Sequence, residues 1–159
     1  MLIYGYLYNK IAARGGTSTS SNNFPSALQG ICPDGWHLPS DAEWEVMIEY
    51  VTNQALYNCQ DNQEKIAKSL ASSGGWSYIF NGNYGSVCSP SNNLFPNDAT
   101  GFSALPAGDQ TSNLFGEFAG FWSTTDYDEQ HWGGIVIWNT QDSISHVNPA
   151  MQSVRCLKD

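Results

Sequence analysis

The pattern of apolar residues changes at Trp76, and this change limits the possible folds more than any other feature of the chain. Before Trp76, two segments repeat apolar residues at helical spacing. After it, short alternating runs are separated by Gly, Asn, Pro and Asp, which is typical of strands joined by turns. Helices followed by antiparallel strands predict an α+β fold.

The first predicted helix spans residues 41–51 and begins at a capping box, in which Ser40 and Glu43 satisfy each other's backbone N–H groups. Its apolar stripe is formed by Trp44, Met47, Ile48 and Val51. A second, weaker box at 61–64 predicts a helix over 61–71, ended by the glycines at 74–75.

The strands expected around these helices are short. They lie at 1–8, 101–105, 121–125, 131–138, 144–147 and 153–157. A stretch with helical propensity is expected at 9–14, and the Gly, Ser, Thr and Asn residues of 15–24 predict a flexible surface loop. All 159 residues are expected to form one domain, since chains of this length usually fold around a single core.

Charge and hydropathy exclude two classes of partner. The net charge is −9, from 15 acidic and 6 basic residues, and such a chain repels phosphate backbones and anionic lipids. We therefore expect no nucleic-acid partner. The longest apolar stretches, such as 133–138, are far shorter than the ~20 residues of a membrane helix, so we expect no membrane span.

The composition and the cysteines favour an exported protein. Only 13% of residues are charged, against a typical value of about 25%, and polarity comes mainly from Ser, Asn, Thr and Gly. The four cysteines are widely spaced without a C-x-x-C pair, which favours disulfides over a zinc or redox site. The N-terminus lacks the features of a signal peptide, so we expect a mature fragment or an excised domain.

Catalytic motifs are absent from the sequence. It contains no G-x-S-x-G, G-x-G-x-x-G, G-K-[ST] or H-E-x-x-H, and its three histidines are far apart. The weak metal candidates are Asp126, Asp128 and Glu129, but Gln130 and His131 break the EF-hand pattern there. We expect no cofactor, with calcium as the alternative.

The last third of the chain is rich in aromatic and hydroxyl side chains. Tyr and Trp give large, rigid contact areas, and Asn, Ser and Asp add adaptable hydrogen bonds, as on protein- and sugar-binding surfaces. The predicted ligand-contact residues are Tyr127, His131, Trp132, Trp138, Asn139, His146 and Asn148. Alternation places Trp132, Val136 and Trp138 on one face of their strand and Ile135 and Ile137 on the other, and leaves open which face is exposed.

Five segments of the chain resemble one known family. They are GYLYNKIAA (5–13), CPDGWHLPSDAEW (32–44), TGFSALPAGDQ (100–110), GFWSTTDYD (120–128) and SVRCLKD (153–159). In this order they resemble the Fibrobacter succinogenes major paralogous domain. The resemblance implies a C-type-lectin-like fold in a secreted or lipid-anchored bacterial surface protein. In that fold, two main helices pack on a small twisted antiparallel sheet, and the N- and C-terminal strands are adjacent.

The resemblance also implies a disulfide between Cys32 and Cys156. Cys59 and Cys88 then remain as the second pair, and the sequence leaves open whether they are bonded. Two differences from related proteins limit which of their activities can be expected of this chain. Where calcium-dependent sugar-binding lectins carry Glu-Pro-Asn and Trp-Asn-Asp, this chain has 95–97 Phe-Pro-Asn and 138–140 Trp-Asn-Thr, without the acidic ligands. Formylglycine-generating enzymes need a late cysteine pair for copper, and Cys156 is the one late cysteine here.

These observations predict a non-enzymatic module on the bacterial cell surface that binds a glycan or a protein through its exposed C-terminal strands and loops. We expect it to be a monomeric domain of a larger extracellular protein. One alternative is a structural or tip domain of a surface protein or pilus. The other is an enzyme of formylglycine-generating-like fold with unknown activity, which would need a pocket around His131 and the acidic cluster at 126–129.

Overall fold

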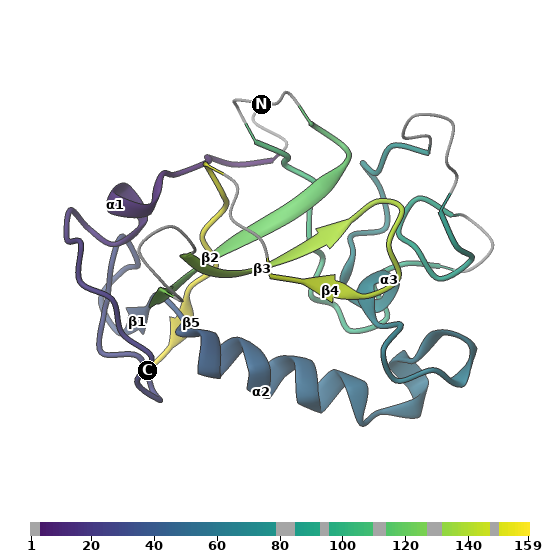
Figure 1. Ribbon diagram of the computed structural model, residues 1–159, viewed down its shortest axis with the longest axis horizontal. Helices are drawn as coiled ribbons and strands as arrows, with labels where there is room; N and C mark the ends of the chain where they lie inside the picture. Colours follow the sequence, from purple (N-terminus) through teal and green to yellow (C-terminus); the bar gives the residue numbers. More distant parts are fainter. Residues whose placement is uncertain (1–3, 79–84, 93–95, 110–113, 127–131, 147–149) are drawn as a thin grey trace.

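The computed structural model describes residues 4–78, 85–92, 96–109, 114–126, 132–146 and 150–159. The elements are α1 (Lys10–Ala13), β1 (Trp36–His37), α2 (Asp41–Thr52), the 3-10 turns η1 (Ala55–Tyr57) and η2 (Cys59–Asp61), α3 (Ala67–Leu70), β2 (Phe118–Asp126), β3 (Trp132–Trp138), β4 (Ile144–Ser145) and β5 (Leu157–Lys158). Figure 1 shows α2 running along one side of the sheet formed by β2, β3 and β4. Few helices and small antiparallel sheets confirm the α+β prediction.

The larger sheet has the order β2-β3-β4 and is antiparallel throughout. Phe118 pairs with Trp138 and Trp122 with Gly134, and the register shifts between Trp122 and Asp126. A Cβ on Gly134 would lie 2.5 Å from the Phe121 carbonyl oxygen, so only glycine allows this close approach of the strands. The smaller sheet pairs β1 with β5.

Both faces of the larger sheet are buried at its centre, which answers the question that alternation left open. Ile135 and Ile137 pack with Trp44 of α2 in the main core. Val136, on the opposite face, is also fully buried. That face is covered by the chain around Gln152, whose side chain has no exposed surface and lies against Gly120 and Gly134.

Helix α2 begins and packs as the sequence predicts. Ser40 accepts from the Glu43 N–H, and Glu43 Oε2 accepts from the Ser40 N–H at 2.9 Å, so the capping box is present. Trp44 and Val51 are buried in the main core, and Met47 and Ile48 are partly buried against it. The short helix predicted at 9–14 is also present as α1, capped by Asn9.

The second predicted helix, over 61–71, is wrong in length, because only the single turn α3 forms. Gln60 and Asp61 both have a φ of 55°, which a continuous α-helix does not allow. The Cys59 N–H donates to the Lys65 carbonyl at 3.1 Å and closes this segment into a loop. A local pattern of helix-forming residues cannot predict this backbone hydrogen bond.

Two of the predicted strands, at 1–8 and 101–105, are wrong for the described residues, and the one at 153–157 is present only at Leu157, where β5 begins. These segments otherwise make isolated bridges. Tyr8 bridges Gln152 in antiparallel orientation, Ala104 bridges Ala71, and Ser153 bridges Phe121. The parts of the chain near its two ends are nevertheless adjacent, as the resemblance implies, because Tyr8 and Gln152 exchange two backbone hydrogen bonds of 2.9 and 3.0 Å. The segment 15–24 has no regular structure, and Ser20 and Ser21 hydrogen-bond to β2.

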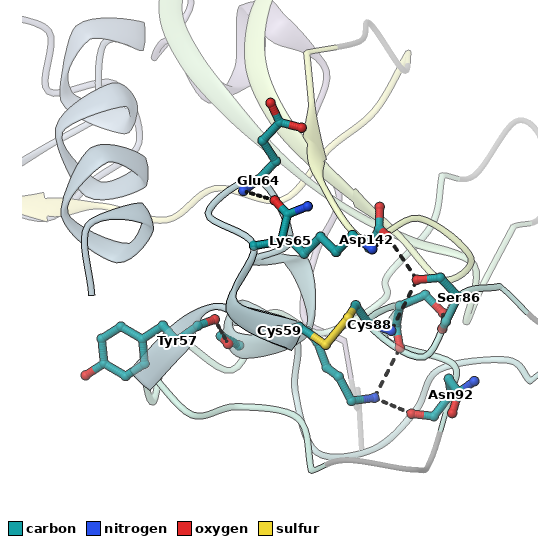
Figure 2. The surroundings of a disulfide bond; sticks show 12 residues. Tyr57, Cys59, Glu64, Lys65, Ser86, Cys88, Asn92 and Asp142 are labelled. Atoms are coloured by element: carbon teal, nitrogen blue, oxygen red, sulfur yellow. Dashed lines mark hydrogen bonds and ion pairs between the residues drawn. A yellow bond between two sulfur atoms is a disulfide. The ribbon is translucent and has the colours of Figure 1, made fainter. Parts of the chain in front are cut away.

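Both disulfides are present. Cys32 is part of a second, smaller core cluster with Ala13, Leu38 and Trp122, and Cys156 packs against this cluster. The Cys32–Cys156 bond joins the segment before β1 to the segment before β5. Cys59–Cys88 joins η2 to the segment 85–92. Figure 2 shows this bond near Asp142, which contacts Lys65 and Ser86.

The same region holds a buried amine. Lys68 is 3% exposed and donates to the backbone carbonyls of Ser89 and Asn92. Burial lowers the pKa of Lys68. Among the described residues, no helix is long and apolar enough to cross a membrane.

Candidate functional site

Four of the seven predicted ligand-contact side chains lie outside the described part of the chain. Tyr127, His131 and Asn148 lie outside the described residues, and so does the side chain of Trp132. Their assignment stays a prediction from the sequence.

The other three positions fall in different surroundings. The Trp138 ring is partly buried, 4.9 Å from the Phe118 ring. Asn139 is 1% exposed, and its amide donates to the Ser77 carbonyl at 3.1 Å, so its side chain is used inside the fold. His146 follows β4 and faces α2. These three residues therefore do not present one common surface.

Asp126, the described member of the acidic cluster, is already neutralised by cations of this chain. Its carboxylate contacts Lys10 Nζ at 2.8 Å and Arg14 Nη2 at 2.8 Å. Burial raises the pKa of Asp126, but hydrogen bonds and charge from Arg14 and Lys10 outweigh this effect and lower it. Calcium at Asp126 would have to displace both cations. Asp128 and Glu129 lie outside the described residues.

A groove of about 480 Å³ lies where β1 and β5 meet the start of α2. We call it the His37 groove. Its lining residues are Pro25, Ser26, Ala27, Gln29, Asp34, Gly35, Trp36, His37, Glu43, Leu157, Lys158 and Asp159. Trp36 and Leu157 are 40% and 44% exposed, so the groove offers apolar surface beside several polar side chains.

His37 lies between two carboxylates at the base of this groove. Its Nδ1 is 2.6 Å from Asp159 Oδ1, and its Nε2 is 2.9 Å from Glu43 Oε1. Burial lowers the pKa of His37, but hydrogen bonds and charge from Asp159 and Glu43 outweigh it and raise the pKa above 6.5. His37 therefore links β1, α2 and the C-terminal segment through one cation.

This raised pKa predicts a pH-dependent stability. The folded protein binds the His37 proton more tightly than the unfolded chain does, so protonation stabilises the folded state. This stabilisation is complete below the unfolded pKa of 6.5 and is lost as the pH rises through the folded pKa. We expect the free energy of unfolding to fall as the pH rises from 6.5 through the folded pKa, with a slope of up to about 1.4 kcal/mol per pH unit for each such histidine. Urea unfolding at several pH values measures it.

His37→Gln is the matched variant, because it keeps hydrogen-bonding groups and removes the titration. Near pH 6, the free energy of unfolding of this variant should be lower than that of the wild type. It should also change less with pH. An unchanged slope would contradict the assignment. Some slope should remain, since Asp41 raises the pKa of His146 as well.

The groove continues along α2. A neighbouring hollow of about 240 Å³ shares Glu43 and Leu157 with it and reaches Phe102 and Arg155. The Arg155 guanidinium lies 4.3 Å from the centre of the Phe102 ring, in a cation–π contact. Burial lowers the pKa of Arg155, although the charge of Asp98 opposes this. A ligand longer than the His37 groove could therefore extend over an aromatic and cationic surface.

The model of the Fibrobacter succinogenes major domain matches residues 2–158. The chain belongs to this family. No curated protein and no solved structure matches it.

In this Fibrobacter succinogenes major domain, two of the segments that carry the resemblance meet at the His37 groove. Trp36 and His37 belong to 32–44, and Leu157 and Asp159 belong to 153–159. The sequence pattern predicts a capping role for Glu43 but does not predict the groove. The sequence did contain one signal. The capping box uses only one carboxylate oxygen of Glu43, and the other oxygen is free to contact His37, six residues earlier in the chain.

Proposed function

We propose that this domain is a non-enzymatic ligand-binding module of an exported bacterial surface protein, with a C-type-lectin-like fold, and that it binds a glycan in the His37 groove. The observation that supports this proposal is the exposed Trp36 ring beside the polar side chains of Gln29, Asp34 and Asp159. An aromatic face gives rigid contact area for the apolar face of a sugar, and planar polar groups can bind its hydroxyls.

The disulfides support the proposed location. Disulfides persist in oxidising compartments, such as the periplasm and the cell surface. Cys32–Cys156 and Cys59–Cys88 are both formed. A protein held together by two such bonds is suited to work outside the cytoplasm.

The surroundings of His37 favour binding over catalysis. A histidine that acts as a general base for a nucleophile needs one ring nitrogen within hydrogen-bond reach of a hydroxyl or thiol. Within the described residues, both ring nitrogens of His37 contact carboxylates instead. These carboxylates hold the imidazolium in place, which gives it a structural and electrostatic role.

A glycan array followed by titration calorimetry tests the proposed function. Trp36→Ala should weaken binding of the best glycan by about 30-fold, the effect of a hot-spot aromatic worth about 2 kcal/mol. Trp36 is partly exposed, so the thermal midpoint should change little.

Tyr78→Ala is the control, because Tyr78 is also exposed, at 57%, and does not line the groove. Equal losses in both variants, or no glycan bound by the wild type, would contradict the proposal. If Tyr127→Ala and His131→Ala weaken binding while Trp36→Ala does not, the site lies at the C-terminal loops predicted from the sequence.

A further inference from the structure

Three side chains of metal-binding type meet between α2 and the end of β4. Asp41 and Glu45 come from α2, and His146 directly follows β4. His146 Nδ1 is 3.6 Å from Asp41 Oδ1, and His146 Nε2 is 3.2 Å from Glu45 Oε1. One ligand atom from each residue can be chosen so that all lie within 4.8 Å of one another.

The fold positions these groups through several independent constraints. Asp41 and Glu45 are four residues apart, so they share one face of the helix. The Asp41 backbone N–H donates to Thr125 Oγ1 at 2.9 Å, which ties the start of α2 to β2. The His146 ring also hydrogen-bonds to the backbone of Gly134 in β3. This bond to β3 helps to fix the orientation of the imidazole ring.

Exposure of the three side chains leaves the cluster open on one side. The Asp41 side chain is 11% exposed, whereas those of His146 and Glu45 are 35% and 55% exposed. The buried carboxylate can therefore act as the fixed ligand, while the two outer side chains adjust.

We propose that Asp41, Glu45 and His146 bind one divalent transition-metal ion of the Zn²⁺ type. Imidazole and carboxylate ligands suit such ions, with bonds of about 2.0–2.2 Å. Tetrahedral geometry places ligand atoms about 3.4 Å apart, and the three chosen ligand atoms, which lie within 4.8 Å of one another here, reach this spacing if the two outer side chains shift slightly. Three protein ligands leave one position for water or for a group of a bound partner. Calcium fits poorly, because it takes 6–8 oxygen ligands.

Binding of ZnCl₂ to the chelator-treated protein, measured by titration calorimetry, tests the site. The wild type should bind one high-affinity equivalent. His146→Ala and Glu45→Gln should each weaken this binding at least about tenfold, as expected when a metal site loses a ligand or its support. Asp41 is left intact because its removal from the helix start could unfold the domain.

Glu49→Gln is the matched control, since Glu49 is an exposed carboxylate one turn further along α2. It should bind Zn²⁺ as the wild type does. Resonances of the His146 ring should also shift during the titration in nitrogen-detected NMR spectra. No tight binding by the wild type would overturn the proposal. The same follows if His146→Ala, folded by circular dichroism, binds Zn²⁺ unchanged, or if all four proteins bind several ions weakly.

Discussion

Replacing both Cys32 and Cys156 by alanine should lower the free energy of unfolding by about 5 kcal/mol. The bond joins positions 124 residues apart, and the chain-entropy model gives the largest stabilisation to such long loops. Domains have a total stability of only about 5–15 kcal/mol, so the double variant should be close to unfolding at physiological temperature. Guanidinium unfolding of the oxidised proteins measures the difference.

The second disulfide provides the control. Cys59 and Cys88 are 29 residues apart, so their replacement by alanine should cost less, about 3.6 kcal/mol in the same treatment. The reverse order of stability would show that native packing around Cys59–Cys88, rather than loop length, dominates the effect.

Asp126→Asn should lower the free energy of unfolding by about 3–5 kcal/mol, because it leaves a buried cation without its carboxylate. Arg14 is 1% exposed and also donates to the Ser123 and Thr125 carbonyls, so its guanidinium cannot easily turn to solvent. Lys10 would lose the same partner. Thermal and urea unfolding of the variant measure this loss.

Asp142→Asn is the matched control. Asp142 pairs with Lys65 at 3.5 Å, and both side chains are more than a quarter exposed, so this change should cost about 1 kcal/mol or less (Figure 2). Adding Arg14→Met to Asp126→Asn should recover part of the loss, since an apolar side chain needs no buried partner. If the two aspartate variants are equally stable, Arg14 does not depend on Asp126.

Features that depend on near neighbours could be predicted from the sequence. Helix α2 begins at the residue that the capping box of Ser40 and Glu43 predicts, because both partners lie within one helical turn. The main strands β2 and β3 also lie where alternating apolar residues predict them. Family resemblance added the pairing of Cys32 with Cys156, which no local pattern contains.

Features that depend on distant segments were decided by the tertiary structure. The sequence could not identify an exposed face of β3, because Gln152 and its neighbours cover one side and α2 covers the other. The helix predicted over 61–71 forms only one turn. A backbone hydrogen bond between Cys59 and Lys65 and the positive φ of Gln60 give the start of that segment a loop conformation.

The candidate sites follow the same division. The sequence by itself determined the residue types, such as Glu43 at the helix start and the histidines 109 residues apart at 37 and 146. Only the tertiary structure brought Asp159 to His37 and His146 to Asp41. The physical reason is that capping and alternation act over a few residues, whereas burial, charge pairing and metal geometry depend on which distant segments the packed core brings within a few ångströms.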